Sequence, residues 1–389
     1  MNYGLYFHIP FCMKKCRYCD FLSFTSFDYS LSDKKAYFRA LLDEWYVKSN
    51  MITEDDVIDS IYFGGGTPSF VEPGYIQTIL KLITDDKIVS DDAEITIEVN
   101  PGTITAEKLE CYREYGVNRI SIGIQSTQNR LLKSLGRIHD ASDCEEAVKL
   151  AVAAGFRNIN CDLIFGIPQV EDEPGQTYEE FVEDLNNVLN WGARHISAYS
   201  LIIEEGTPMC KLFEEKKAFE ISSEVERRMY HDIPKFIKEH SMRMYEISNF
   251  ARIGCESRHN LKYWKCLPYI GFGLGAASYY PVDSTDKNSD YIRETNTRKF
   301  VDYNNKYYLG EKEIIDKEEQ MKEFMMLGFR CVSGPNKNTF KSRFGCDYAE
   351  VFKGQLERLS EKGLIVFNKA AKLTKKGYDF ANEVFREFV

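Results

Sequence analysis

The chain has 389 residues, enough for one large α/β domain and a smaller appended domain. Its hydrophobic content of 43% and charged content of 28% exclude a disordered, fibrous or coiled-coil protein. The formal net charge of −10 disfavours binding to a nucleic-acid backbone. We see no charged leader and no apolar run of membrane-spanning length, so we expect a cytoplasmic protein.

Strand and helix patterns alternate between residue 4 and about residue 203. Apolar segments with a period of two are expected as strands over Gly4–Pro10, Asp59–Phe63, Glu94–Asn100, Arg119–Gln125, Asn158–Phe165 and His195–Ile203. Amphipathic segments are expected as helices over Lys34–Val47, Tyr75–Thr84, Ala106–Tyr115, Ala141–Ala153 and Tyr178–Trp191. This order predicts a parallel sheet with right-handed crossovers, and a closed barrel, an open doubly wound sheet or a partial barrel all fit it.

Polar side chains stand at or near the carboxyl ends of these apolar strands. Glu98, Gln125 and Asp162 each follow this rule, and Tyr6 and His8 share one face of the first strand because they are two residues apart. In barrel-type folds the carboxyl ends of the strands and the loops after them form the active face. The sequence therefore predicts a catalytic face where polar groups from four strands converge.

The alternation ends after Ile203. Residues 224–240 are expected as a helix and residues 244–247 as a strand. Residues 281–296 are polar, and we interpret them as a linker.

The carboxy-terminal part, from Phe300, is helix-rich and ends with two short strands and a helix, an order similar to a winged helix. We therefore expect a barrel domain over residues 1–285 and a helical, winged-helix-like domain over residues 286–389. The second domain lacks a dense arginine face, so a structural role is favoured over nucleic-acid binding.

The 11 cysteines are an odd number without a secretory signal, which argues against a disulfide framework. Most of them stand singly in apolar segments. We expect these, which include Cys111, Cys144, Cys161 and Cys331, to be small buried hydrophobic residues.

Three cysteines instead stand together, as Cys12-x₃-Cys16-x₂-Cys19 directly after the first strand. Three thiolates suit a [4Fe–4S] cluster, which takes one cysteine per iron, and they leave the fourth iron open to a ligand. A structural zinc site normally needs four protein ligands, and no second paired-cysteine motif supplies them. Recruitment of His8 or Asp20 to such a site is the weaker alternative.

A glycine-rich segment, Gly64-Gly65-Gly66-Thr67-Pro68, follows the second strand. Glycines let the backbone approach a ligand closely and adopt positive φ. The segment is neither a Walker loop nor a dinucleotide-binding fingerprint. On its own it is consistent with an ordinary turn as well as with a ligand loop.

The cysteine motif is similar to that of the radical S-adenosylmethionine (SAM) superfamily. In that superfamily the open iron chelates the methionine part of SAM, and one electron from the cluster cleaves the sulfonium to give a 5′-deoxyadenosyl radical. The resemblance implies a partial (β/α)6 TIM-like barrel and a cluster on the three cysteines. It also implies that Tyr18 packs on the cofactor and that Gly65, Gly66 and Thr67 belong to the methionine-binding loop.

Further motifs narrow the resemblance, and they occur in the order Tyr6-Phe-His-Ile-Pro-Phe-Cys12, Gly64-Gly-Gly-Thr-Pro68, Glu98-Val-Asn-Pro101, Ser121-Ile-Gly-Ile-Gln125, Leu135-Gly-Arg137 and Asp162-Leu-Ile-Phe-Gly-Ile-Pro168. Together they resemble the oxygen-independent coproporphyrinogen III oxidase family over essentially the whole chain. The resemblance implies a SAM pocket formed by Tyr6, Gly65, Glu98, Gln125, Arg137 and Asp162. Carboxylates and an amide suit the ribose hydroxyls and the amino group, and Arg137 suits a carboxylate.

Three features distinguish the branches of this family. Oxidases carry a fourth cysteine where this chain has Phe21, and an N-terminal extension where only 11 residues precede Cys12. The segment His259-Asn-Leu-Lys-Tyr263-Trp264 resembles the signature of the haem-chaperone branch. His259 is then a candidate to ligate haem iron or to pack on the porphyrin. The alternative is that His259 and Trp264 close the barrel.

Two departures from the branch pattern affect the expected pocket. Ala277 stands where many members of the chaperone branch have a histidine. An acidic insertion, residues 169–174, interrupts a loop after the fifth strand. Pocket shape and partner docking are therefore left open.

The leading hypothesis is a haem chaperone that binds haem, carries a SAM-binding [4Fe–4S] cluster and delivers haem to acceptor proteins at the membrane periphery. An electron donor such as a flavodoxin or ferredoxin is expected, and a homodimer is compatible with the sequence. The alternatives are a coproporphyrinogen III dehydrogenase, which decarboxylates two propionates, and a winged-helix regulator that binds nucleic acid.

Overall fold

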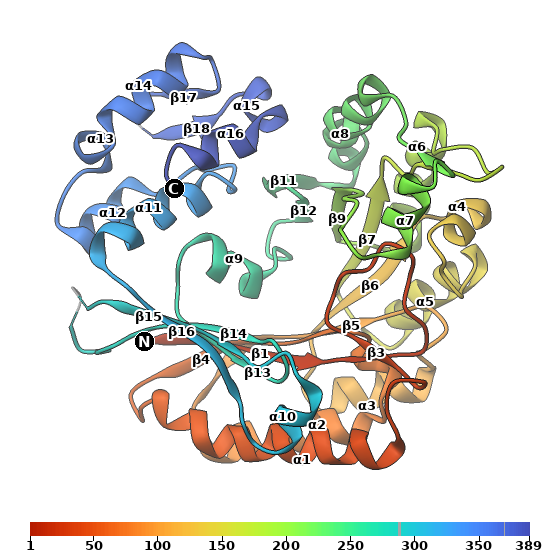
Figure 1. Ribbon diagram of the computed structural model, residues 1–389, viewed down its shortest axis with the longest axis horizontal. Coiled ribbons are helices and arrows are strands. Elements are labelled where there is room, and N and C mark those ends of the chain that lie inside the picture. Colours follow the sequence, from red (N-terminus) through yellow and green to blue (C-terminus); the bar gives the residue numbers. More distant parts are fainter. Residues whose placement is uncertain (287–288, 369) are drawn as a thin grey trace.

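A curved mixed sheet forms the centre of the computed structural model, which describes residues 1–286, 289–368 and 370–389 (Figure 1). The strands lie in the order β11-β12-β9-β7-β6-β5-β4-β1-β13-β14-β15-β16. In that order they span Met242–Glu246, Asn249–Arg252, His195–Ser200, Asn158–Phe165, Arg119–Gln125, Val89–Val99, Val57–Gly65, Asn2–Ile9, Tyr269–Phe272, Ala277–Pro281, Tyr291–Asn296 and Leu309–Ile315.

The strands from β9 to β13 are all parallel, and β1, β4, β5, β6, β7 and β9 are neighbours in chain order. β9 pairs with β12 and β1 pairs with β13, so the two ends of the series do not meet and the barrel stays open. The expected partial (β/α)6 barrel is thus confirmed. Its parallel strands all end at one rim, which brings their carboxyl-terminal side chains together.

Helices cover the outside of the parallel strands (Figure 1): α1 (Leu31–Lys48), α2 (Pro73–Asp86), α3 (Ala106–Glu114), α4 (Asn129–Ser134), α5 (Ala141–Ala153), α6 (Tyr178–Trp191) and α8 (Ser223–Ile237). Their starts follow local signals. Asp140 and Thr177 form capping boxes at α5 and α6, and Gly192 ends α6 with a φ of 123°. Isoleucine, valine and leucine from both layers form one continuous core between the sheet and the helices.

Smaller elements surround the barrel. They are the strand pairs β2 (Phe11–Cys12) with β3 (Phe24–Thr25) and β8 (Gln169–Val170) with β10 (Ala218–Phe219), the helices α7 (Pro208–Glu214), α9 (Arg258–Trp264) and α10 (Phe300–Asn304), and the 3₁₀ turns Ser49–Met51, Pro68–Phe70 and Lys238–His240.

The linker expected over residues 281–296 was wrong at both ends, because Pro281 is the last residue of β14 and Tyr291–Asn296 form β15. β15 pairs with β14 and β16 and extends the sheet beyond the barrel. The residues looked polar because only part of the strand is buried: Tyr291, Glu294 and Asn296 face inward, and two of these three are hydrophilic. The division of the chain at residue 285/286 stays a prediction.

The carboxy-terminal residues form a separate helical unit with the elements α11 (Lys317–Gly328), α12 (Lys337–Phe344), α13 (Tyr348–Val351), α14 (Lys353–Glu361), β17 (Ile365–Phe367), β18 (Ala371–Leu373), α15 (Lys375–Asp379) and α16 (Ala381–Arg386). β17 and β18 form an antiparallel pair, as the winged-helix pattern predicts. An aromatic core that includes Phe324, Phe340 and Phe352 holds this unit together. Arg343 ties it to the barrel by donating to the Cys266 carbonyl over 2.8 Å.

A buried charge network joins α1 to β15. Lys48 Nζ lies 3.2 Å from Glu44 and 3.1 Å from Glu294, and it donates to Asn296 Oδ1 over 2.8 Å. Tyr303 adds a 2.6 Å hydrogen bond to Glu44. All of these side chains are buried, so each charge depends on its partners for stability.

Candidate functional site

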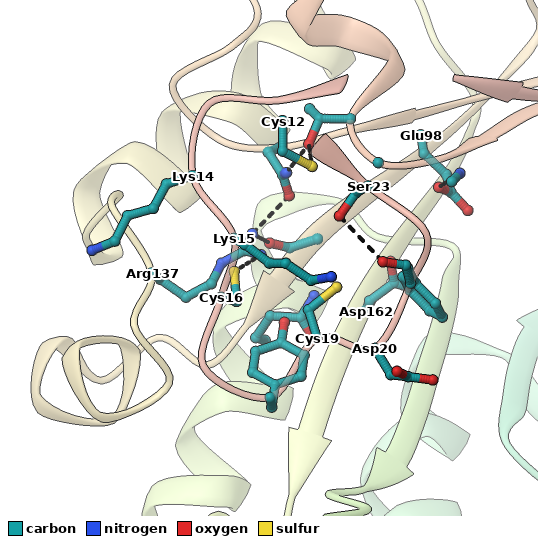
Figure 2. Close-up of a pocket in the computed structure, with 18 of the residues that line it drawn as sticks. Cys12, Lys14, Lys15, Cys16, Cys19, Asp20, Ser23, Glu98, Arg137 and Asp162 are labelled. Atoms are coloured by element: carbon teal, nitrogen blue, oxygen red, sulfur yellow. Dashed lines mark hydrogen bonds between the residues drawn. The ribbon is translucent and has the colours of Figure 1, made fainter. Parts of the chain in front are cut away.

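A cavity of about 400 Å³ opens at the carboxyl ends of the parallel strands (Figure 2). Its size is within the range of ~300–1,000 Å³ that small-molecule sites occupy. Of the site residues expected from the sequence, only Tyr6 and His259 do not line this cavity. The residues that do line it are Cys12, Cys16, Tyr18, Cys19, Gly65, Gly66, Thr67, Glu98, Gln125, Arg137 and Asp162.

The loop that carries the three cysteines is fixed by backbone hydrogen bonds. β2 and β3 pair at its two ends, so the loop leaves and returns at the same place. Within the loop, the Cys19 amide donates to the Cys16 carbonyl over 3.3 Å. The Arg17 amide donates to the Leu135 carbonyl over 3.0 Å, which anchors the loop to the segment after α4. The chain itself therefore holds the cysteines at the cavity.

The three thiols face the cavity together with polar groups of the strands (Figure 2). Cys12 Sγ lies 3.5 Å from Thr67 Oγ1, and Arg137 donates to Cys16 Sγ over 3.4 Å. Burial raises the pKa of Cys12, and it raises the pKa of Cys19 to about 11. A bound metal therefore has to displace protons from these thiols.

The donor set fits a cluster rather than a single ion. Across residues 1–286, 289–368 and 370–389, no three His, Cys, Asp or Glu side chains are grouped to hold one metal ion, and neither His8 nor any other ligand closes the cysteine loop as a zinc site. Three cysteine thiols in one open cavity match a [4Fe–4S] cluster with one cysteine per iron and one free iron.

Two glycines at the end of β4, Gly65 and Gly66, are required because other parts of the chain approach their backbone closely. Gly65 has a φ of 113°, and a Cβ there would meet the His8 ring at 2.5 Å. A Cβ on Gly66 would meet the Phe11 amide nitrogen at 2.9 Å. Only glycine fits at these positions, so the loop presents bare backbone to the cavity.

Glu98 is held at the cavity wall by two donors. The Tyr62 hydroxyl donates to Oε1 over 2.8 Å, and the Gly65 amide donates to Oε2 over 3.1 Å. Burial raises the pKa of Glu98 to about 7, although these hydrogen bonds oppose the rise and the nearby Asp162 adds to it. Burial also raises the pKa of Asp162, whose Oδ1 accepts from Asn160 over 2.8 Å. A ligand that donates hydrogen bonds or carries positive charge would favour the ionised forms of both groups.

Gln125 and Arg137 complete the opposite wall. Gln125 ends β6 with a φ of 71°, a strained value for a residue with a side chain, and its Oε1 accepts from Tyr199 over 3.1 Å. Arg137 donates to Asn100 Oδ1 over 2.7 Å and to the Gly123 carbonyl over 2.6 Å. Its buried Nε has no partner in the described parts of the chain, so this arginine has capacity for a carboxylate of a ligand.

Tyr6 does not line the cavity. It points into the barrel, where its hydroxyl lies 3.1 Å from His8 Nδ1 and its ring stacks on Tyr62 at 6.1 Å. Tyr62 in turn contacts Glu98. Tyr6 is therefore connected to the cavity indirectly, through Tyr62 to Glu98 and through His8 to Gly65.

His259 lies at the other end of the barrel. α9 covers the starts of the strands: the His259 amide donates to Glu94 Oε1 over 3.1 Å, and Lys262 donates to the Asn2 carbonyl over 3.0 Å. Both ring nitrogens of His259 have partners, since Nδ1 lies 3.0 Å from Ser60 Oγ and Nε2 lies 2.8 Å from the Tyr263 hydroxyl. The side chain is 1% exposed, and burial lowers its pKa to about 3. This position matches the alternative in which the segment closes the barrel.

Comparisons with known proteins agree with this geometry. The sequence model of the radical SAM superfamily matches residues 6–184, and the model of the HemN C-terminal domain matches residues 315–380. The heme chaperone HemW of Bacillus subtilis is 34% identical over 388 residues, which cover 99% of this chain and 98% of that protein. HemW of Escherichia coli is 31% identical over 390 residues and is also covered to 98%. This chain belongs to the HemW family.

The fold of this HemW-family chain is shared with a solved structure of coproporphyrinogen III oxidase (HemN) from Escherichia coli. The two superimpose with a TM-score of 0.79 over 99% of this chain and 89% of the other, at 20% sequence identity. At that identity the likeness concerns the fold alone. In the HemW-family chain, Phe21 lines the cavity and its side chain is exposed.

Several residues that line the cavity of the HemW-family chain were not predicted. Asn100, Ser121 and Gly123 belong to motifs that the sequence analysis quoted, so their neighbours gave a signal. Tyr199, near the end of β9, and Ile202, just after it, gave no signal because this part of the chain carries no motif.

The two departures from the branch pattern have defined places in this HemW-family chain. Ala277 begins β14, where its carbonyl leaves no space for a Cβ at Gly271. The insertion at residues 169–174 begins with β8, which pairs with β10 and so is part of an ordered structure. No membrane-spanning helix is found in the described ranges of the chain.

Proposed function

We propose that this protein is a haem chaperone: it binds haem, carries a [4Fe–4S] cluster with SAM, and delivers haem to acceptor proteins in the cytoplasm or at the membrane periphery. The binding of a cluster and SAM is supported by the cavity at the carboxyl ends of the strands. Three thiols, a glycine loop, two carboxylates and an arginine line this cavity. Membership of the HemW family supports the haem part.

The cysteines Cys12, Cys16 and Cys19 would hold the cluster. When bound, the cluster and SAM supply one-electron chemistry at the open iron. The chain contributes binding and orientation: Arg137 offers its free Nε to the carboxylate of SAM, and the Gly65–Gly66 backbone allows close approach of the methionine part. Glu98 and Asp162 offer acceptors for the amino group or the ribose hydroxyls.

Electron supply to the cluster requires a donor protein, and we propose a flavodoxin or a ferredoxin. Lys14 and Lys15 flank the cluster cysteines at the cavity mouth, on a chain whose net charge is −10. A local positive charge at the mouth favours encounter with an acidic donor.

One anaerobic preparation tests the function against its main alternative. The protein with reconstituted cluster is titrated with haem, and a portion is incubated with coproporphyrinogen III, reductant and SAM. We expect a saturable haem difference spectrum and no protoporphyrinogen. Steady decarboxylation would instead make the protein an oxidase, and the absence of saturable haem binding would contradict the chaperone function.

A further inference from the structure

A second cavity lies far from the cysteines, between the carboxy-terminal unit and the turn that links β11 to β12. Its volume is about 550 Å³. We call it the C-terminal groove and define it by Ile247, Arg330, Tyr378, Phe380, Phe385 and Arg386. Backbone hydrogen bonds build its floor, since the Ile247 amide donates to the Arg330 carbonyl over 3.0 Å and the Val332 amide donates to the Tyr245 carbonyl over 3.0 Å.

The guanidinium group of Arg330, which lines this groove, packs against two aromatic rings. Its guanidinium carbon is 4.2 Å from the Trp264 ring centroid and 5.8 Å from that of Phe385. Within the described chain, no hydrogen bond or ion pair reaches the guanidinium group, and Nε is buried without a partner. The charge of Arg330 opposes the rise that burial causes in the pKa of Glu246, but Glu246 accepts hydrogen bonds from Ser248 and Asn249 through Oε1, and its Oε2 has no partner among the described residues. The stacked arginine therefore retains its full donor capacity.

The carboxylates of the groove have ion-pair partners, whereas its second arginine has none among the described residues. Its two carboxylates are already paired: Asp379 lies 2.7 Å from His231 Nε2, and Glu383 lies 2.5 Å from Lys362 Nζ. Arg386 is exposed and has no ion pair among the described residues. Two arginines in one aromatic groove thus lack partners, whereas its acidic groups have them.

We propose that the C-terminal groove is the haem site, with the porphyrin ring against Phe380 and Phe385 and the two propionates on Arg330 and Arg386. The inference rests on the proposed haem-chaperone function and assigns its cargo site. A planar apolar ring with two carboxylates matches an aromatic wall with two unpaired arginines. Phe380 is 46% exposed, so one aromatic face is open to a ligand.

This placement gives the segment His259–Trp264 a role at both of its ends. The His259 end closes the barrel through its hydrogen bonds with Ser60 and Glu94, and the Trp264 ring at the other end packs against the Arg330 guanidinium group. α9 therefore orients a groove arginine without any contact between His259 and haem. Trp264 is a positioning residue in this arrangement.

The test is a haem titration of the full chain, followed in the Soret band, with ferric haem and its dimethyl ester as ligands. Because a charged hydrogen bond contributes more than one tenfold step in affinity, we expect Arg330→Gln/Arg386→Gln to weaken haem binding by about tenfold or more. The ester lacks propionate charges, so its affinity should be nearly equal for the wild type and this variant. Arg39→Gln, an exposed position on α1, removes the same charge elsewhere and should bind haem like the wild type.

Arg386→Glu provides a variant that is safe for folding, because Arg386 is exposed and unpaired in the described structure. It should weaken haem binding more than Arg386→Gln does, with the cluster absorbance unchanged. Wild-type affinity in both Arg386→Glu and the double glutamine variant would overturn the groove site while leaving the chaperone function intact. A wild-type protein that binds no haem would overturn both.

Discussion

The Tyr62 hydroxyl donates a 2.8 Å hydrogen bond to Oε1 of Glu98, so a side chain inside the barrel holds a carboxylate at the wall of the cofactor cavity. The Tyr62 ring lies 5.3 Å from the ring of His259, which comes from the opposite end of the barrel. A packed core transmits small displacements between such neighbours. The shape of the cavity therefore depends on Tyr62 and His259, which do not line it.

Tyr62→Phe should weaken SAM binding by about three- to tenfold, because loss of one hydrogen bond to a charged group costs roughly 1 kcal/mol or slightly more. Equilibrium binding of SAM to the reconstituted protein measures the effect. Tyr112→Phe is the matched control, since Tyr112 is also buried but its hydroxyl has no partner in the described structure and Tyr112 does not line the cavity. Equal affinities in the two variants would contradict a positioning role for Tyr62.

Glu98→Gln should change how the stability of the cofactor-free protein depends on pH. Burial raises the pKa of Glu98 from 4.5 to about 7, so the folded protein retains a proton that the unfolded chain releases above about pH 4.5. The stability from this proton is complete below pH 4.5 and is lost as the pH rises through 7.

We therefore expect Glu98→Gln to gain stability relative to the wild type between pH 5 and pH 8, by on the order of 1 kcal/mol because the cavity partly hydrates the carboxyl. Urea unfolding at the two pH values measures this gain. Glu107→Gln, at an exposed position of α3, should show no such change over this range. If the difference in unfolding free energy between Glu98→Gln and the wild type were the same at pH 5 and pH 8, Glu98 would already be ionised at pH 5.

His259→Ala should lower the free energy of unfolding by about 2–4 kcal/mol, because it leaves Ser60 and Tyr263 unpaired in a buried site. At a temperature where the variant is folded, its haem Soret band should match that of the wild type, since neither ring nitrogen is free for iron. A changed Soret band in folded protein would restore His259 as a haem ligand. Denaturant midpoints and haem spectra of one preparation separate these outcomes.

Cys16→Ser should abolish the cluster without unfolding the chain. Iron and sulfide content should fall to the background, and SAM should no longer perturb the electron paramagnetic resonance of the reduced protein. Cys111→Ser is the control, because Cys111 is a lone cysteine on α3 outside the cavity. A full complement of iron in Cys16→Ser would contradict the assignment of this thiol.

Lys48→Met should destabilise the protein by about 3–5 kcal/mol, because it leaves the buried carboxylates of Glu44 and Glu294 without a positive charge. Lys306→Met removes an exposed ion pair with Asp43 and should cost less than about 1 kcal/mol. Urea unfolding at neutral pH compares the two. Equal midpoints would show that Lys48 is dispensable in the network.

The sequence predicted the barrel well because its strands are buried on both faces and carry a regular pattern. β6 and β7 have the expected bounds, Arg119–Gln125 and Asn158–Phe165, since apolar residues recur at every second position and nearly every position is buried. The strand β15 was missed because its inward positions carry Glu294 and Asn296, which are satisfied by residues far away in the chain. The local pattern of polar and apolar residues contains no information about partners that are distant in the sequence.

The cavity was predictable for a related reason. Motif spacing located the cysteines, the glycine loop and the polar strand ends, and parallel topology brings those ends together. Topology also explains the two exceptions. Tyr6 stands too early in β1 to reach the rim, and His259 stands on a helix whose place at the opposite end follows only from the three-dimensional fold.

The Lys48 network also constrains how the protein is synthesised. Lys48 and Asn296 are separated by 248 residues, so α1 emerges from the ribosome roughly ten to fifty seconds before its partner strand at about 5–20 residues per second. During that interval the buried Lys48–Glu44 pair lacks its hydrogen-bond partners Asn296 and Tyr303. The amino-terminal half is therefore poorly suited to fold on its own, and cellular chaperones that shield nascent chains should engage it until β15 is complete.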